Sequence, residues 1–300
     1  MPVILDTDMA TDCDDAGAMA VLHALSVAGE AKILAVVVNN KHHNSIGAVA
    51  AINAFYGRGD IPLGAYQEDE VGVEAAVFVQ ELAHDTQTYG HTIRSRREVP
   101  SAVETYRQTL AAASDKEVAI ISIGHLNNLA GLLDSGPDQH SPLPGVKLVE
   151  QKVARLVVMG GAYPAGKRHN FSARGSGPFT ARVMKSWPTP ILFSGHHLGL
   201  PVKTGPALSV LPPSHPVHKA YALHPSNPLQ KGRSSWDQTA VLAAVRGPAC
   251  FWELSTLGRN LVDPDGSNQW QDDPHGIQAY LIERDPPELV AAEIERLMTH

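Results

Sequence analysis

Short runs of Val, Ile and Leu recur along the chain, and stretches with apolar residues at helical spacing follow them. The strand-like runs are 3–5, ILAVVV from Ile33, VAIISIG (118–124), ARLVVMGG (154–161) and TPILFSG (189–195). The helical candidates are DDAGAMAVLHALSV, GAVAAINAFYG, NLAGLLDS, GPFTARVMKSW and DQTAVLAAVRG. Strands buried on both faces are apolar almost throughout, and intervening helices provide parallel crossovers. The alternation therefore predicts an α/β fold with a mostly parallel, doubly wound, Rossmann-like sheet.

The pattern changes in the last third of the chain. Residues 201–233 are rich in Pro, His and Ser, so we expect loops and short helices there rather than a linker between domains. FWELS, RNLVD, DGSNQW and IQAYLIE predict a small antiparallel C-terminal elaboration, and PPELVAAEIERLMT has the spacing of a closing amphipathic helix. We expect residues 1–300 to form a single domain with the inserted region 201–233.

Composition limits the classes of partner. The net charge is −7 and the pI is near 6.1, so no basic surface for nucleic acid or anionic lipid is expected. Cys13 and Cys250 lack the spacing of a disulfide framework or a zinc site, which favours reduced thiols. No apolar run reaches the roughly 20 residues of a membrane-spanning helix, and PVILD is too short for a leader. We therefore expect a cytoplasmic protein that acts on a small molecule, with no nucleic-acid or membrane partner.

Five aspartates crowd into ten positions directly after the first apolar run: Asp6, Asp8, Asp12, Asp14 and Asp15. Aspartates favour helix caps and first turns, which accounts for one or two of them, and Asp12 is the best candidate for a cap or a supporting role. Like charges this close repel unless a cation gathers them, and Ca²⁺ and Mg²⁺ prefer oxygen ligands. The ligand site of a doubly wound sheet lies beyond the carboxyl ends of its strands. The loop therefore predicts a divalent metal site at that edge.

Four motifs, in order along the chain, resemble those of the nucleoside hydrolases. LDTDMATDCDDAGAMAVL resembles the N-terminal signature of the inosine-uridine preferring family, in the form DxDxxxDxDD. GHLNNLA resembles the family's GPLTNLA segment, VVMGGAY its MGG segment, and WDQTAVLAAV the start of its late helix. The resemblance runs from residue 2 to about residue 246. It implies the α/β fold of the nucleoside hydrolases, a homodimer or homotetramer, and calcium-dependent hydrolysis of ribonucleosides to ribose and free base.

The resemblance also implies a metal site and a general base. A single Ca²⁺ would be bound by the carboxylates of Asp8, Asp15 and Asp237, with the main-chain carbonyl of Asn127 and waters completing the shell. Ca²⁺ takes about 6–8 oxygens, so a cis diol of ribose can fill its open positions. By the same resemblance Asp8 would be the general base that activates water. Without the resemblance, Asp237 would be interpreted as an N-cap, because it opens a helix after a polar loop.

Further residues would contact the substrate by the same resemblance. They are Asp14 on the ribose 2′-hydroxyl, Asn39 or Asn40 on the sugar, Met159 on the pocket floor, and Asn170 on the ribose. Trp236, which does not follow from the resemblance, is a further candidate for substrate contact. Asn44 is an alternative to Asn39 and Asn40, and any of the three can instead serve a turn. Met159 can equally be core packing, and Trp236 can either stack on the base or fill the core beside a helix start.

Two positions depart from the family pattern. Arg168 stands where the family carries Glu, in a loop that is several residues shorter, so the charge is reversed where the sugar 5′-hydroxyl would lie. This departure raises the hypothesis of a 5′-phosphate or another anionic extension on the substrate. Trp236 takes the place of a His, so the resemblance does not identify the acid that protonates the leaving base. Imidazole titrates near neutral pH, so histidines on predicted loops are candidates for this acid. They are His91, His169, His196 and His197.

Two other functions are alternatives. ILDTDMAT also resembles the opening of haloacid-dehalogenase-type phosphatases, in which the first Asp is a nucleophile that works with Mg²⁺. LVDPDG is a poor match to their late acidic pair, and those enzymes do not explain Asp14, Asp15 or MGGAY. The second alternative is a relative that binds nucleoside or ribose but has lost turnover, which Arg168 and the shortened loop favour. Hydrolysis is the preferred interpretation because the carboxylate set is intact.

Overall fold

The apolar runs form neighbouring parallel strands of one sheet in the computed structural model, which describes residues 1–73 and 77–300. Within these residues the strand order is β3-β2-β1-β4-β5-β7-β13-β11-β12-β6, and β10 pairs with β13. Every neighbouring pair from β3 to β13 in this order is parallel. These strands are β3 (Leu63–Ala65), β2 (Lys32–Val38), β1 (Pro2–Thr7), β4 (Val118–Ser122), β5 (Val153–Met159), β7 (Ile191–Ser194) and β13 (Gln278–Glu283).

The C-terminal strands continue the main sheet. The antiparallel members are β10 (Trp252–Leu254), β11 (Gly258–Val262), β12 (Ser267–Asp272) and β6 (Ala165–Lys167). The expected antiparallel elaboration is therefore present, but IQAYLIE, which contains the whole of β13, runs parallel to β7 and belongs to the central sheet. Its alternation, with Ala279 and Leu281 buried, is compatible with either strand direction, so the sequence pattern did not reveal this.

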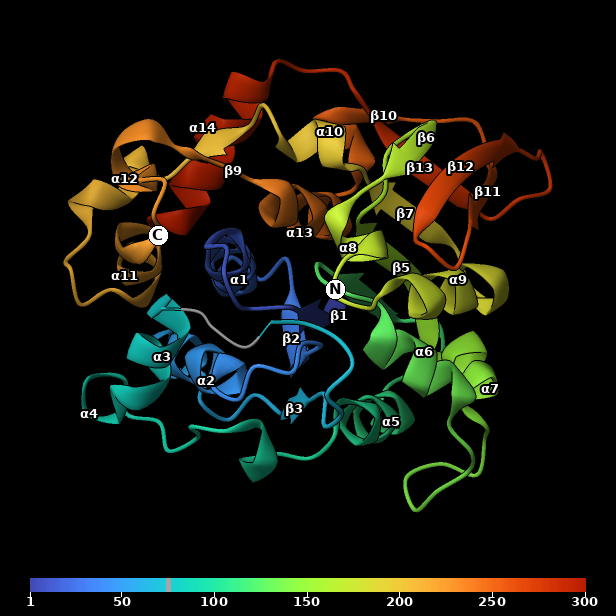
Figure 1. Cartoon of the computed structure of the whole chain (residues 1–300), viewed down its shortest axis with the longest axis horizontal. Helices are drawn as coiled ribbons and strands as arrows, with labels where there is room; N and C mark the ends of the chain where they lie inside the picture. The colour runs from blue at the N-terminus through green and yellow to red at the C-terminus, as the bar shows by residue number, and fades with distance from the viewer. Residues whose placement is uncertain (74–76) are drawn as a thin grey trace.

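Helices cover both faces of the sheet, as a doubly wound fold requires (Figure 1). Val3 and Leu5 of β1 pack in one apolar core and Ile4 packs in the other, which explains the continuous apolar runs. On the first face lie α1 (Asp14–Val27), α2 (Ser45–Phe55), α13 (Trp236–Arg246) and α14 (Pro287–Met298). On the second face lie α5 (Ala102–Ala112), α6 (Asn127–Asp134), α7 (Gly145–Lys152) and α9 (Gly177–Ser186).

Short elements complete the fold. They are α3 (Val77–His84), α4 (Thr86–Tyr89), α8 (His169–Ser172), α10 (His196–Gly199), α11 (Pro216–Leu223), α12 (Pro228–Lys231), and the antiparallel pair β8 (Lys203–Thr204) and β9 (Arg233–Ser234). The region 201–233 thus contains short helices between β8 and β9, and Gln238 Nε2 of α13 donates to the Tyr221 hydroxyl of α11 at 2.7 Å. Among the described residues, no helix has the length and apolarity needed to cross a bilayer.

Candidate active site

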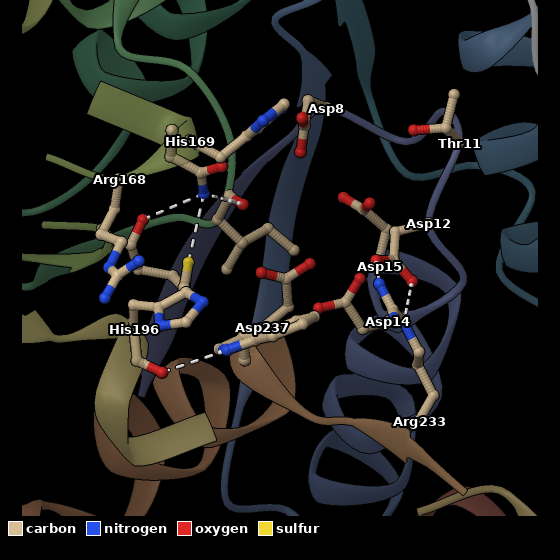
Figure 2. A pocket seen from close by; sticks show the side chains of 15 residues that line it. Asp8, Thr11, Asp12, Asp14, Asp15, Arg168, His169, His196, Arg233 and Asp237 are labelled. Carbon is tan, nitrogen blue, oxygen red and sulfur yellow. Dashed lines mark hydrogen bonds and ion pairs between the residues drawn. The ribbon is translucent and has the colours of Figure 1, made fainter. Parts of the chain in front are cut away.

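A cavity of about 260 Å³ lies at the carboxyl edge of the parallel strands. Asp8 follows β1, Ile123 follows β4, Met159 ends β5, and His196 opens α10 after β7. Because these strands are adjacent and parallel, their ends meet at one edge of the sheet. The residues that line the cavity are Asp8, Thr11, Asp12, Asp14, Asp15, Ile123, Met159, Gly160, Arg168, His169, Asn170, His196, Arg233, Trp236 and Asp237 (Figure 2).

Three carboxylates from two helix N-termini meet in this cavity. Asp14 and Asp15 open α1, and Asp237 lies in the first turn of α13, which packs against α1. One oxygen of each lies within 4.8 Å of the other two. Burial, and then repulsion from neighbouring carboxylates, raises the pKa of all three side chains well above the usual range. In the described part of the chain none of the three forms an ion pair, so this buried oxygen cluster can hold a metal ion.

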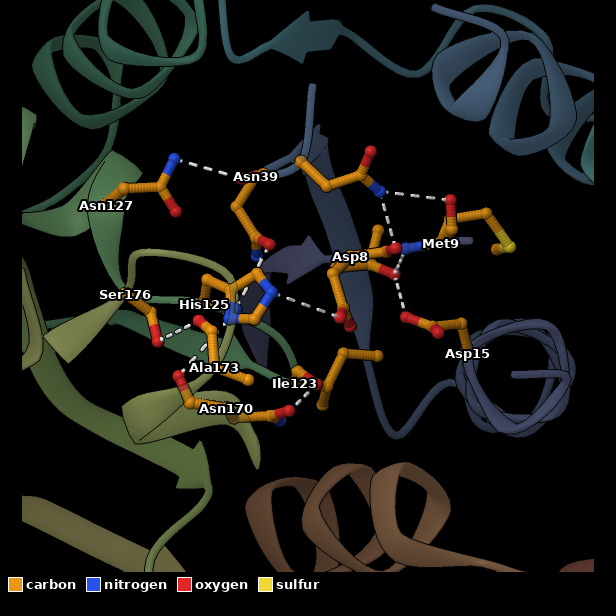
Figure 3. Close-up of polar contacts among 12 residues, drawn as sticks. Asp8, Met9, Asp15, Asn39, Ile123, His125, Asn127, Asn170, Ala173 and Ser176 are labelled. Atoms are coloured by element: carbon orange, nitrogen blue, oxygen red, sulfur yellow. Dashed lines mark hydrogen bonds and ion pairs between the residues drawn. The ribbon is translucent and has the colours of Figure 1, made fainter. Parts of the chain in front are cut away.

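Asp8 lies beside this cluster and faces two histidines. One Asp8 oxygen and one nitrogen each from His125 and His169 lie within 4.8 Å of one another, and His125 Nε2 is 3.8 Å from Asp8 Oδ2 (Figure 3). Burial raises the pKa of Asp8 to about 6, and the electrostatic influence of His169 opposes part of that rise. A carboxylate with this pKa is mostly ionised at neutral pH yet basic enough to accept a proton.

The close oxygen cluster and the ligand set implied by the resemblance overlap in part. Asp15 and Asp237 belong to both. Asp14, which we expected on the ribose 2′-hydroxyl, contributes the third oxygen, and Asp8 lines the same cavity next to the cluster. All four carboxylates therefore reach one cavity, and the expected division of roles among them stays a prediction.

Asn127 is placed elsewhere. Its Nδ2 donates to the main-chain oxygen of Asn39 at 2.9 Å, and it lines a separate cavity between α6 and α9. The chain passes close to the acidic loop at Gly124, where a Cβ would come within 2.7 Å of Asp8 Cβ, and α6 then leads away. As a result Ile123, at the end of β4, borders the carboxylate cavity, whereas Asn127, the first residue of α6, does not.

Asn39, Asn40 and Asn44 follow β2 and are not among the residues that line the cavity. Asn39 Nδ2 donates to Asp6 Oδ1 at 2.8 Å. Its Oδ1 accepts from the His125 main-chain N–H at 3.1 Å (Figure 3). Asn40 Nδ2 donates to the main-chain oxygen of Asp8 at 2.6 Å. Asn44 Nδ2 donates to the main-chain oxygen of Arg94 at 2.7 Å. Sugar contact by Asn39 or Asn40 therefore stays a prediction, and in this structure all three side chains bond to other parts of the protein.

Asn170 and Met159 do line the cavity. Asn170 Nδ2 donates to the main-chain oxygens of Ile123 at 2.9 Å and Met159 at 3.1 Å. These two bonds fix the amide so that its Oδ1 is left to accept a hydrogen bond from a ligand hydroxyl.

Trp236 lines the cavity between two polar neighbours. Its ring stacks on His196 with centroids 5.3 Å apart, and the Arg233 guanidinium lies 5.1 Å from the ring centroid. Arg233 also forms a bidentate ion pair with Asp12, with Nε 3.0 Å from Oδ1 and Nη2 bonded to Oδ2. Asp12, for which a cap or a supporting role was expected, therefore lines the cavity as the ion-pair partner of Arg233. Sequence reasoning missed Arg233, because no local pattern links it to a loop at the other end of the chain.

Two of the four candidate histidines reach the cavity. His169 and His196 line it, whereas His91 and His197 do not. Burial lowers the pKa of both lining imidazoles, which makes their protonated forms stronger acids. Sequence reasoning missed His125, although its position in GHLNN, directly after a buried strand, was a signal for it.

Comparison with known proteins identifies the family and the fold of this chain. The family model described as inosine-uridine preferring nucleoside hydrolase matches residues 3–175. A plant nucleoside hydrolase, PpNRh1, is 19% identical with a TM-score of 0.70, over 99% of this chain and 98% of that chain. The inosine-uridine preferring nucleoside hydrolase from Bacillus anthracis is 16% identical with a TM-score of 0.70, over 99% and 97%.

A purine-preferring ribonucleoside hydrolase from Gardnerella vaginalis is also 16% identical with a TM-score of 0.70, over 100% of this chain and 98% of that chain. The comparison with curated proteins gave no match. At these identities the solved structures establish the fold, while the family model covers more than half of the chain, including the whole acidic loop. The chain therefore belongs to the family of inosine-uridine preferring nucleoside hydrolases.

Proposed function

We propose that this N-ribosyl hydrolase is calcium-dependent and cleaves ribonucleosides to ribose and free base, with Asp8 as the general base. The observation that carries the proposal is the cluster of Asp14, Asp15 and Asp237 oxygens next to Asp8 in one cavity. Ca²⁺ tolerates irregular shells of carboxylate, hydroxyl and water oxygens, so this donor set suits it better than Mg²⁺, which demands an octahedron. When bound, the ion supplies a Lewis-acidic centre that holds a vicinal diol.

The protein's own groups divide the remaining work. N-glycosidic cleavage passes through an oxocarbenium-like transition state, which needs an activated water on one face of the sugar and a stabilised leaving base. Asp8 accepts the proton of the attacking water, and Asn170 Oδ1 accepts a hydrogen bond from a ribose hydroxyl. His169 and His196, on the cavity wall away from the Asp14–Asp15 pair in Figure 2, are placed to donate a proton to the departing base.

A panel of purine and pyrimidine ribosides tests the proposal, with base release and reducing sugar as the two readouts. We expect turnover that chelation abolishes and added Ca²⁺ restores. Asp8→Asn keeps the side-chain shape but removes the base, so kcat should fall by about 10²–10⁴-fold. Turnover that survives both chelation and Asp8→Asn would refute the mechanism. Phosphate release from a phosphate ester, with no base release, would favour the phosphatase alternative, and calorimetric binding without products would indicate a relative that has lost turnover.

A further inference from the structure

Arg168 brings an uncompensated positive charge to the cavity. It is the residue before α8, and it lines the cavity together with Asn170 two positions later. Its side chain is exposed, and across residues 1–73 and 77–300 its guanidinium forms no hydrogen bond or ion pair. The other cavity arginine, Arg233, is already neutralised by its bidentate pair with Asp12. Arg168 is therefore the cavity guanidinium that is available to a ligand.

The charges in the cavity are separated in space. Figure 2 shows Asp12, Asp14 and Asp15 on one side and Arg168, His169 and His196 on the other. A diol held at the carboxylate cluster turns the rest of the sugar toward the opposite wall. In ribose, the diol carbons lie between the anomeric carbon and the carbon that bears the 5′ group. Asp8 activates the water that attacks the anomeric carbon, so it must lie near that end of the sugar. The 5′ end then lies near a different residue of the cavity wall.

We propose that Arg168 binds a phosphate on the ribose 5′ carbon, so that 5′-phosphorylated ribosides are the preferred substrates. This inference rests on the proposed hydrolase function. The guanidinium fork matches the oxygens of a phosphate in a bidentate, charge-assisted contact. It has no acceptor atom for the proton of a free 5′-hydroxyl, so a plain nucleoside leaves the charge of Arg168 without a partner.

Lys167 provides a matched control for this site. It is adjacent to Arg168 and also exposed, but it pairs with Asp265 at 3.0 Å and does not line the cavity. Arg168→Glu and Lys167→Glu therefore change the net charge equally at neighbouring positions. Arg168→Gln removes the charge without adding repulsion, so it replaces Arg168→Glu in the test if the charge reversal disturbs folding.

The first experiment measures kcat/KM of the full chain for inosine and uridine and for their 5′-monophosphates. We expect the wild type to prefer the monophosphates by about tenfold or more, the advantage of a charge-assisted contact. Arg168→Glu should lower the ratio of monophosphate to nucleoside by more than about tenfold, Arg168→Gln should lower it less, and Lys167→Glu should keep the wild-type ratio. Equal use of both substrate classes by the wild type, or the same ratio in Arg168→Glu and Lys167→Glu, would overturn the inference.

A binding experiment separates this inference from the proposed function. Calorimetry on the calcium-saturated protein should show ribose 5-phosphate binding about tenfold or more tightly than ribose, and Arg168→Glu should remove the difference. If that pattern appears while no riboside is cleaved, the hydrolase proposal fails and the phosphate site stands. If ribose and ribose 5-phosphate bind equally, the phosphate site is refuted whatever the turnover assay shows.

Discussion

Asp6 and Asp8 are two positions apart, yet they serve different purposes. Asp6 is fully buried behind the cavity, where its Oδ1 accepts from Asn39 at 2.8 Å and Asn128 at 3.2 Å. Its Oδ2 accepts from the Tyr106 hydroxyl at 2.8 Å. These bonds tie β1 to β2, α5 and α6, and burial raises the pKa of Asp6 to about 7 despite them. The carboxyl of Asp6 therefore holds neighbouring elements together, while that of Asp8 faces the cavity.

This division predicts opposite effects of the same isosteric change. Asp6→Asn turns one acceptor of the network into a donor, which leaves a buried donor unpaired and should lower the free energy of unfolding by about 1–3 kcal/mol. Asp8→Asn removes a charge from a repulsive cluster, so it should leave stability unchanged or raise it while turnover is lost. Urea unfolding of the chelator-treated variants measures both. Equal stability losses in the two variants would contradict the assignment.

At the scale of elements, α1 and α2 are joined by a buried imidazole. His23 Nε2 lies 2.9 Å from Asn53 Oδ1, and the ring stacks on Tyr56 with centroids 4.5 Å apart. Burial lowers the pKa of His23 to about 4 from its ordinary 6.5. Between these two values the unfolded chain binds a proton that the folded chain excludes, so the contribution of His23 to stability is lost as the pH falls from 6.5 toward 4.

His23→Gln tests this pH dependence, because Gln keeps a donor for Asn53 but does not titrate. The difference in free energy of unfolding between pH 7 and pH 4.5 should be about 2–3 kcal/mol smaller in His23→Gln than in the wild type. His43→Gln, at an exposed histidine, should retain the wild-type difference. Denaturant unfolding at the two pH values gives the comparison. The same pH dependence in all three proteins would show that His23 does not link helix packing to protonation.

For the whole molecule, the carboxylate cluster joins early and late parts of the chain. Asp14 and Asp15 belong to the first helix and Asp237 to α13, and their buried charges oppose folding until a cation binds. At a free Ca²⁺ concentration about 100 times the dissociation constant, the gain is about 2.7 kcal/mol, or about 4 °C in melting temperature for a chain of this length. Asp237→Asn should remove most of that shift, and Asp265→Asn, on the exposed surface, should keep it. Calorimetric melting with and without Ca²⁺ measures this shift in melting temperature. An equal shift in both variants would rule out the carboxylate cluster as the binding site.

The sequence predicted the local elements well and the long-range pairings poorly. The strand-like runs became β1, β2, β4, β5 and β7 with small boundary shifts, because burial on both faces leaves a strong apolar signal. The meeting of the early aspartates with Asp237 came only from the family resemblance. The pairing of Asp12 with Arg233 and of Asn39 with Asp6 depends on loop geometry in three dimensions, which local spacing does not encode. Asn127 was expected at the cavity from the family resemblance, whereas in the structure Ile123 borders the cavity and Asn127 begins a helix that leads away from it.

The pairing of β6 with β12 connects the last fifty residues to the loop before Arg168, although none of the cavity-lining residues comes from that part of the chain. Lys167 is in register with Ser267, and Asn268 bonds both main-chain groups of Ala162, so a hairpin a hundred positions downstream sets where the Arg168 wall stands. Loss of the two Asn268 bonds would therefore displace the loop that precedes Arg168 while every side chain that lines the cavity stayed the same. Substitutions outside the cavity, in the β11–β12 hairpin, can therefore change the shape of the cavity.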